Sequence, residues 1–466
     1  MLIPLKLVRD EPLQQQLFEQ LRDLILAGRL ASGTRMPSTR MLADQFAVSR
    51  ITVLLTYERL IAEGLLETLP AVGTFVRQPA QCDSPAKTDS VPHLGHQPPP
   101  EREIGRPDPA EFPAQRWRTL IRGVLDRLGA NLGTDRPDGH PELRRAIANW
   151  LSTSRGLTAS PEQIILTACR QQALYLAAHL LVRPGQHAVV EDPCDRRVES
   201  ILTRASATLT RVPVDADGLR TDLLPAGGAA LIYVTPEHQC PLGTVMSLDR
   251  RQALLDWAVL EDVTIVEDDC DGELRYGRMD VPPLMSLDRE ERVIHAGCFA
   301  AALGPGVMLG YLVVPPRLVA AALTARRLID GRAGWLEEAA LAEFLDSGAY
   351  ALHLHRLRKV YLTRRDTLIG ALRQHFGEST EVSGAEAGLY LTWSLPANIG
   401  PAAMVADVAR RSGLDAVPVA WSPARIGHPT VLLGFGLPAD RKIASAVGRM
   451  AASLAAGTTG VALSAD

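Results

Sequence analysis

The sequence predicts a small helical N-terminal domain, a linker, and a larger α/β domain that ends in a small α+β subdomain. Residues 1–77 place apolar residues at helical spacing between serine and glycine boundaries. Residues 78–104 are rich in proline and have no hydrophobic period, and residues 105–460 alternate short apolar strands with helical stretches. The chain has 466 residues, of which 46% are hydrophobic, so both predicted domains have enough apolar side chains to form a core.

The composition and the ends of the chain limit the class of protein. A net charge of −4 gives no general sign of nucleic-acid binding, so a DNA-binding surface must come from the placement of a few basic residues. The start of the chain has no signal-peptide core, and glycines and prolines interrupt the longest uncharged run, residues 293–316. We therefore expect a cytoplasmic protein with no membrane partner, whose six cysteines do not form structural disulfides.

The first 77 residues predict a winged helix-turn-helix. A first helix has one apolar face, formed by Leu13, Leu17, Leu21, Leu24 and Ile25. Ser38 is placed to cap a short helix over residues 39–46, and Ser49 to cap a longer helix that runs to residue 63. The apolar face of the longer helix includes Val53, Tyr57, Leu60 and Ile61. Residues 65–68 and 73–76 are expected to pair as the wing.

Three motifs make this segment resemble the DNA-binding domain of the GntR regulators over its whole length. They are Gly33-Thr34-Arg35-Met36-Pro37-Ser38-Thr39-Arg40, Val48-Ser49-Arg50-Ile51-Thr52-Val53 and Val72-Gly73-Thr74-Phe75-Val76. The first turn of a recognition helix enters the major groove of double-stranded DNA, where Arg50 would pair with O6 and N7 of a guanine. We predict DNA contacts from Arg35, Ser38, Arg40, Ser49, Arg50, Thr52, Gly73 and Thr74. The alternative for each lone arginine is a solvated surface charge, and for the two serines a purely structural cap.

Residues 78–104 predict a flexible linker that is semi-rigid where the prolines cluster. Cys82, His93 and His96 lie in this segment. Two histidines three residues apart in an irregular segment are a weak sign of a metal site, and we assign them no function.

The remaining chain predicts a largely parallel sheet with helices on both faces. The expected strands are residues 164–167, 188–191, 230–235, 264–267, 293–296 and 310–314. Functional side chains are expected at the carboxyl ends of these strands. From Ala339 the pattern predicts one long helix to Ala371, followed by the α+β subdomain.

An ordered set of motifs makes this region resemble the aminotransferase-like domain of the MocR branch of the GntR regulators. Among them are Gly139-His140-Pro141-Glu142-Leu143-Arg144, Gln171-Gln172-Ala173-Leu174, Thr235-Pro236-Glu237-His238-Gln239 and Glu267-Asp268-Asp269. The resemblance implies a fold-type-I aminotransferase fold, which holds pyridoxal phosphate in the enzymes. It also implies a homodimer that recognises paired half-sites on DNA.

The resemblance locates the cofactor lysine, and this chain lacks it. The family sequence G-T-F-S-K-T-L-x-P-G-x-R-L-G-Y corresponds to residues 297–311, so Ala301 stands at the Schiff-base lysine and Met308 at the arginine. The chain has four lysines against 45 arginines, and Lys359 and Lys442, the two in this domain, lie in predicted helices away from the motif. Because a Schiff base needs an amine, we expect no covalent pyridoxal phosphate and no transamination.

Most other cofactor positions are also changed. Asp268 keeps the position of the pyridinium partner, but Cys270 replaces the tyrosine that contacts the ring hydroxyl, and Leu432 replaces the carboxylate-binding arginine. Noncovalent binding of pyridoxal phosphate, held by Asp268 and Arg170, stays open.

Five of the six cysteines fall at positions that line the cofactor cavity in the family. The predicted effector pocket comprises Cys169, Arg170, Gln171, Cys194, His238, Cys240, Asp268, Cys270, Cys298 and Ala301. A thiol-rich pocket binds a soft metal ion or reacts with oxidants through thiolates, which Arg170 would favour. The candidate metal ligands are Cys169, Cys240, Cys270 and Cys298, with His238 and His295 as nitrogen donors. The alternative is that each cysteine is a small, buried and inert residue.

These features predict a transcription regulator that binds an operator as a homodimer and whose aminotransferase-like domain senses an effector without catalysis. Three alternatives stay open. The protein is a thiol- or metal-responsive regulator, a pyridoxal-phosphate-dependent enzyme with a DNA-binding module, or a constitutive DNA binder whose large domain only dimerises. The effector, whether a small molecule, a metal or a redox signal, is not specified by the sequence.

Overall fold

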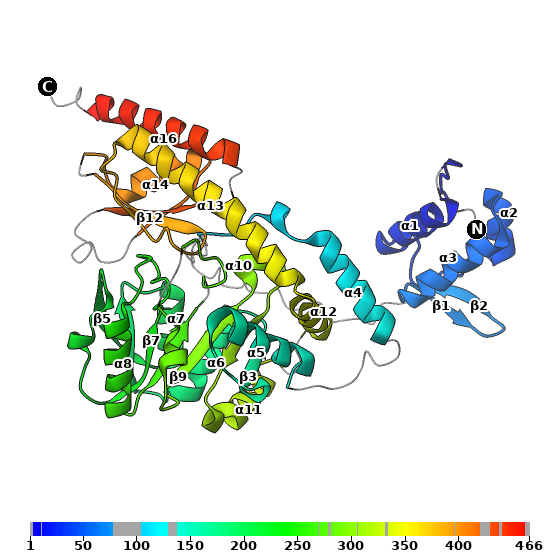
Figure 1. Cartoon of the computed structure of the whole chain (residues 1–466). Helices are drawn as coiled ribbons and strands as arrows, with labels where there is room; N and C mark the ends of the chain where they lie inside the picture. Colours follow the sequence, from blue (N-terminus) through cyan, green and yellow to red (C-terminus); the bar gives the residue numbers. More distant parts are fainter. Residues whose placement is uncertain are drawn as a thin grey trace. The chain divides into compact units, whose positions relative to one another are not determined.

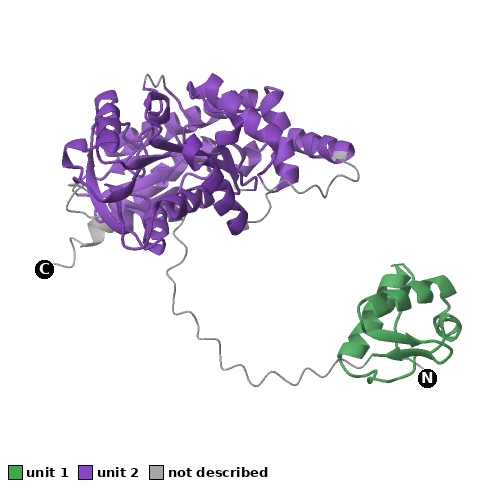
Figure 2. Ribbon diagram, turned by 90° about the horizontal axis from the view of Figure 1, so that it is seen from below, with its two compact units in different colours: residues 1–101 green, residues 102–466 purple. Residues whose placement is uncertain are grey.

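The computed structural model describes most of the chain as two compact units, residues 1–101 and 102–466 (Figures 1 and 2). The described residues are 3–10, 12–77, 104–128, 138–269, 271–277, 281–304, 306–330, 334–396, 398–419, 429–437 and 440–461. Cys82, His93, His96 and Cys270 lie outside them. No described helix is long and apolar enough to cross a membrane.

The first unit is the predicted winged helix-turn-helix. Its elements are α1 (Leu13–Leu26), α2 (Thr39–Phe46), α3 (Arg50–Ala62), β1 (Leu66–Leu69) and β2 (Gly73–Val76). Leu17, Leu21, Val53 and Leu60 are fully buried where α1 packs against α3. Ala47 takes a left-handed conformation (φ 52°) and turns the chain from α2 into α3.

The predicted apolar face of α3 was wrong at one residue. Ile61 is 37% exposed, and the inner position is taken by Thr56, which is fully buried. The Thr56 hydroxyl donates a hydrogen bond to the carbonyl oxygen of Thr52 (2.8 Å), which satisfies its polar group inside the domain. Thr56 lies three residues after Val53 and four before Leu60, so helical spacing favours it over Ile61.

The second unit is built on an eight-stranded, mostly parallel sheet with the order β3-β10-β9-β8-β7-β4-β5-β6. The strands are β3 (Ile164–Thr167), β4 (His187–Asp192), β5 (Thr208–Asp215), β6 (Gly218–Leu219), β7 (Ala229–Val234), β8 (Thr264–Asp268), β9 (Val293–Cys298) and β10 (Gly310–Val313). The pairings β9-β8, β8-β7, β7-β4 and β4-β5 are parallel, whereas β10 is antiparallel to both its neighbours. All six predicted strands are present. The strand β5 was missed because most of its residues are only partly buried, and β6 because two residues are too few to form an apolar run.

Helices cover both faces of the sheet because successive strand residues point to opposite sides (Figure 1). Val190 and Tyr233 pack with α6 (Arg170–Leu181), α7 (Arg196–Arg204) and α11 (Val319–Asp330). Val189 and Ile232 pack on the other side with α8 (Leu248–Leu260) and α9 (Leu284–Leu287). At the β3 end, the core is formed with α4 (Ala114–Leu128), α5 (Pro141–Arg155), α12 (Trp335–Asp346) and α13 (Ala349–Phe376).

The single long helix predicted from Ala339 to Ala371 was wrong. The chain forms two helices, α12 and α13, separated at Ser347 and Gly348. Gly348 has a φ of 70°, which a helix interior does not allow and which glycine adopts without strain. The two helices pack on the same core, so their apolar pattern runs on across the break.

The predicted α+β subdomain closes the chain. Its antiparallel sheet has the order β11-β12-β14-β13, formed by β11 (Val382–Ser383), β12 (Tyr390–Ser394), β13 (Asp415–Pro418) and β14 (Thr430–Gly434). The helices α14 (Ala402–Arg411) and α16 (Asp440–Val461) complete the subdomain, and α16 packs against α13. Tyr390 on β12 reaches the cavity described below.

Candidate functional site

The first candidate site is the start of α3 with the neighbouring wing. Ser49 caps α3 by accepting a hydrogen bond from the Thr52 amide (3.0 Å), and its hydroxyl also lies 2.8 Å from the Thr52 hydroxyl. Ser38 caps α2 by accepting from the Met41 amide (3.3 Å). Both predicted caps are confirmed, and each stabilises the first turn of its helix by accepting a hydrogen bond from a backbone amide.

The three predicted arginines of this unit are exposed. The Arg50 guanidinium, on the first residue of α3, donates from Nε to the Thr39 hydroxyl (3.3 Å), which orients it across the start of α2. Arg35 donates to the Val72 carbonyl oxygen (2.7 Å) at the tip of the wing. A Cβ at Gly73 would come within 3.0 Å of Arg35 Nε, so glycine leaves room for this arginine.

The remaining predicted residues of this surface are Arg40, in the first turn of α2, and Thr74, on β2. The Thr74 hydroxyl lies 3.2 Å from that of Thr68 across the wing. The sequence reasoning missed Ile51, which is 67% exposed directly after Arg50. An exposed apolar residue on the first turn of a recognition helix is suited to contact a thymine methyl group. The sequence could have indicated Ile51, because it is an apolar residue that does not lie on the apolar face of α3.

The Ser49 cap yields a prediction that separates stability from DNA contact. Ser49→Ala is expected to lower the opening free energy of α3 by about 1 kcal/mol, because the Thr52 amide loses its partner. Ser49→Asp keeps a capping acceptor and is expected to retain the protection of α3, but its charge should weaken DNA binding by repelling phosphate. Amide hydrogen exchange of α3 and DNA titration measure the two effects. Unchanged protection of α3 in Ser49→Ala would contradict the assigned cap.

The second candidate site is a cavity of about 230 Å³ in the second unit. It lies at the carboxyl ends of β3, β7, β8 and β9, as expected for this kind of sheet. Eight of the predicted pocket residues line it: Cys169, Arg170, Gln171, His238, Cys240, Asp268, Cys298 and Ala301. Cys194 is not among the lining residues, because it is buried (4% exposed) with its Sγ 3.7 Å from the Asp195 carbonyl oxygen.

Arg170 is the centre of a polar cluster in this cavity. Its Nε and Nη2 lie 2.7 and 2.6 Å from Oδ2 of Asp268, and its Nη1 lies 2.9 Å from Oδ2 of Asp195. Tyr233 joins the cluster, since its hydroxyl donates to Asp268 (2.7 Å) and lies 3.0 Å from Arg170 Nη2. Sequence reasoning missed Asp195 and Tyr233. The only indication of Asp195 in the sequence was its place directly after Cys194, one of the predicted pocket residues.

Two of the predicted pocket thiols, Cys240 in the cavity wall and Cys194 outside it, do not have the low pKa that the redox hypothesis requires. Burial raises the pKa of Cys240 to about 12 and that of Cys194 well above its usual value. The charge of Arg170 lowers the pKa of Cys240, as expected, but burial outweighs it. A low-pKa thiol is therefore not supported at these two cysteines.

The predicted nitrogen donors are also engaged. His238 Nδ1 lies 2.8 Å from Asp271 Oδ2 and its Nε2 3.1 Å from the Gly384 carbonyl oxygen, while His295 Nδ1 lies 3.0 Å from Glu267 Oε2. Within the part of the chain that the structure describes, no group of three or more His, Cys, Asp or Glu residues is placed to hold a metal ion. Metal binding that includes Cys270 stays a prediction.

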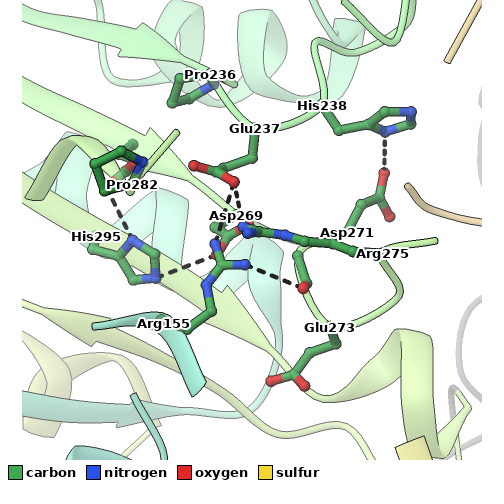
Figure 3. A network of polar contacts seen from close by, with 12 residues as sticks. Arg155, Pro236, Glu237, His238, Asp269, Asp271, Glu273, Arg275, Pro282 and His295 are labelled. Atoms are coloured by element: carbon green, nitrogen blue, oxygen red, sulfur yellow. Dashed lines mark hydrogen bonds and ion pairs between the residues drawn. The ribbon is translucent and has the colours of Figure 1, made fainter. Parts of the chain in front are cut away.

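A buried network of charges lies beside the cavity (Figure 3). Arg155 pairs with Asp269 and lies 3.6 Å from Glu237, and Arg275 also pairs with Glu237. Burial raises the pKa of Asp269 to about 7 despite the charge of Arg155, and burial likewise raises the pKa of Glu237. The sequence reasoning did not assign these residues to a site, because the network joins residues up to 114 positions apart, which no local pattern connects.

Glu191 gives a prediction for the pH dependence of stability. Burial raises its pKa to about 7, although hydrogen bonds from Thr235 (2.5 and 3.2 Å) and Gln239 (3.1 Å) lower it. The unfolded carboxyl titrates near about 4.3, so the folded protein binds more protons than the unfolded chain between about pH 4 and about pH 7. Its stability contribution is therefore lost as the pH rises through this window.

Glu191→Gln removes the titrating group. The stability of this variant relative to the wild type is expected to rise with pH across the window, by up to about 1.4 kcal/mol per pH unit. Urea unfolding at several pH values, followed by a probe of the second unit, measures the difference. A difference that does not depend on pH would contradict the raised pKa.

Comparison with known proteins places both units. The model of bacterial regulatory proteins of the gntR family matches residues 13–76, and the model of aminotransferase class I and II matches residues 110–415. The chain is 35% identical over 404 residues to the probable rhizopine catabolism regulatory protein MocR of Rhizobium meliloti, covering 82% of this chain and 81% of that protein. It is also 35% identical over 370 residues to the pyridoxine biosynthesis transcriptional regulator PdxR of Corynebacterium glutamicum, covering 78% and 80%.

The second unit has the fold of solved aminotransferases. It is similar to an archaeal alanine:glyoxylate aminotransferase with a TM-score of 0.69 and 27% identity, covering 76% of this chain and 92% of that one. The match to the MocR protein is longer than the second unit, so it includes part of the first. The chain therefore belongs to the GntR family of helix-turn-helix transcriptional regulators, in the MocR-type branch that carries an aminotransferase-like domain.

Proposed function

We propose that this regulator binds a specific operator as a homodimer and that its aminotransferase-like domain senses an effector without catalysing transamination. One observation carries the second half of the proposal. Ala301 lines the cavity at the position that the family motif gives to the Schiff-base lysine. The described lysines, Lys6, Lys359 and Lys442, are exposed, and none lines the cavity. Covalent cofactor chemistry needs an amine there.

The cavity supports a sensing role by its size and lining. About 230 Å³ of space is lined by charged and apolar side chains from strand ends of the large sheet and by Tyr390 of the small sheet. If the domain can take two arrangements in which the two sheets are placed differently, a ligand that contacts both sheets makes different contacts in each arrangement. Such differential affinity is what allows a ligand to change DNA binding.

The cavity is also lined by a cation, Arg106, that has no ion pair among the described residues. Arg106 lines the cavity, its Nε is buried without a hydrogen-bond partner, and the described part of the chain offers its guanidinium no carboxylate within 4.0 Å. We therefore expect the effector to carry an anionic group, a carboxylate or a phosphate, that pairs with Arg106.

A test starts from the assembly and a ligand screen. Sedimentation of the full chain with DNA that it selects from a random pool should give two chains per operator, and one chain per operator would contradict the homodimer.

Thermal-shift screening of small anionic metabolites against the full chain and its Arg106→Ala variant should yield compounds that stabilise only the wild type. Compounds that stabilise both equally would contradict the role of Arg106. A constitutive DNA binder would bind a hit without any change in operator affinity.

A further inference from the structure

We propose that the side chain of Arg170 occupies the place of the cofactor in this domain and excludes pyridoxal phosphate, whether covalent or noncovalent. This inference goes beyond the proposed function, which concerns only the missing lysine. Pyridoxal phosphate is the group that the fold implies, and the residues present can be tested against it. The test rests on the two ends at which the cofactor would be held, Asp268 for the ring nitrogen and the start of α6 for the phosphate.

The ring-nitrogen end is already taken by a cation. Asp268 is 4% exposed at the end of β8, and Oδ2 of its carboxylate lies 2.7 Å from Arg170 Nε, 2.6 Å from Arg170 Nη2 and 2.7 Å from the Tyr233 hydroxyl. A pyridinium N–H requires the same carboxylate as its acceptor. Because the Arg170 guanidinium already occupies the contact with Oδ2, a pyridinium could pair with Asp268 only by displacing it or by adding a second cation beside it.

The phosphate end is where the Arg170 side chain starts. Arg170 is the first residue of α6 and follows Cys169, the residue at the helix N-cap. The N-terminus of a helix is the usual cradle for a phosphate, through its free backbone N–H groups. Since the backbone of Arg170 is at this end and its guanidinium is at Asp268, its side chain lies along the line that the cofactor would follow.

The charges of the cluster are balanced without a cofactor. Asp195 is 2.9 Å from Arg170 Nη1 and 3.0 Å from Arg197 Nη2, so two guanidinium groups serve the two carboxylates Asp195 and Asp268. Burial alone would raise the pKa of Asp195, but the charges of Arg170 and Arg197 hold it well below its usual value. Removing Arg170 would take away the guanidinium that lies against the buried carboxylate of Asp268, and an incoming pyridinium would restore that positive charge.

The experiment restores the lysine with and without Arg170. Pyridoxal phosphate binding is measured on the full chain by equilibrium dialysis and absorbance, and attachment at position 301 by borohydride reduction and peptide mass. The wild type and Ala301→Lys are expected to bind no stoichiometric cofactor. Ala301→Lys with Arg170→Ala is expected to bind it at least about tenfold more tightly than Ala301→Lys alone, because Asp268 becomes available for a charge-assisted hydrogen bond.

The matched control is Ala301→Lys with Arg197→Ala. Arg197 pairs with Asp195, whereas Arg170 is the guanidinium held at 2.6–2.7 Å from Asp268 Oδ2, so a variant that keeps Arg170 is expected to exclude the cofactor as Ala301→Lys does. Ala301→Lys with Arg170→Gln is a second test variant that leaves Asp268 a neutral donor if the alanine variant does not fold. Its cofactor affinity is also expected to exceed that of Ala301→Lys.

Stoichiometric binding by the wild type or by Ala301→Lys would overturn the inference, and neither measurement depends on the folding of an Arg170 variant. Folded Arg170 variants that bind no better than Ala301→Lys would also overturn it. Neither result would affect the proposed function, because a noncovalently bound pyridoxal phosphate would itself be a candidate effector. The proposed function fails on a different measurement, the response of operator affinity to a bound ligand.

Discussion

Arg50→Ala is expected to remove most of the sequence-specific DNA affinity of this regulator. Arg50 is exposed on the first residue of α3, and the Thr39 hydroxyl holds its Nε at 3.3 Å. A bidentate arginine–guanine contact contributes about 1–3 kcal/mol of base discrimination, and a homodimer makes the contact twice. The expected loss is therefore about 2–6 kcal/mol for the selected operator, with little change for unrelated DNA. Fluorescence anisotropy at fixed salt, on DNA selected from a random pool by the wild type, measures both affinities.

Two further variants identify the kind of contact. Arg50→Lys keeps the charge but not the planar fork, so it should lose discrimination nearly as Arg50→Ala does if the contact is to a base. Arg22→Ala is the control, because Arg22 on α1 lies beside its own domain's Phe18, 5.6 Å from the ring centre. Arg50→Lys with wild-type discrimination would assign Arg50 to phosphate contact and contradict the account of α3 as the recognition helix.

Arg251→Met is expected to destabilise the second unit by about 3–5 kcal/mol. Arg251 is fully buried on α8, and its guanidinium pairs with Glu237 (2.9 Å). It also donates to three backbone carbonyl oxygens, those of Met246 (3.0 Å), Pro236 (2.8 Å) and Pro282 (3.0 Å). Methionine matches much of the volume but satisfies none of these acceptors, so the buried carboxylate and carbonyl groups would lose partners that water cannot replace.

The control for this prediction is Arg220→Met. Arg220 pairs with Asp222 (2.6 Å) on the surface, and its side chain is 39% exposed, so its loss should change stability by less than about 1 kcal/mol. Urea unfolding of both variants, followed by a signal from the second unit, gives the comparison. Equal effects of the two substitutions would contradict the structural role of the buried network around Glu237.

The sequence predicted those parts of the fold that depend on local patterns. Ser38 and Ser49 precede their helices with the spacing of N-caps, and both caps are present. The strands ending at Thr167 and Asp268 contain short apolar runs of strand length, and both are buried as such runs predict. The helix that was predicted to run through Gly348 is an exception with a local cause. The two helices pack on one core and share one apolar pattern, so the pattern does not reveal the break that Gly348 makes between them.

The candidate pocket was predictable in position but not in chemistry. The family motifs placed Cys169, Asp268 and Ala301 in one cavity, and the structure brings them there. The pairing of Arg170 with Asp268 joins residues 98 positions apart, and no local pattern specifies which carboxylate an arginine will reach. The sequence also overestimated the thiolate character of Cys240, because burial raises the pKa of its thiol more than the charge of Arg170 lowers it.

The most direct test of the central claim is the effect of a cavity ligand on operator affinity. A compound that stabilises the wild-type chain but not Arg106→Ala would be titrated into the operator complex, and the operator into the ligand complex. We expect the ligand to change the operator Kd by about 5- to 150-fold, and the operator to change the ligand Kd by the same factor, because coupling between two sites is reciprocal. A ligand that saturates the cavity and leaves the operator Kd unchanged would contradict the claim that the aminotransferase-like domain is the sensor.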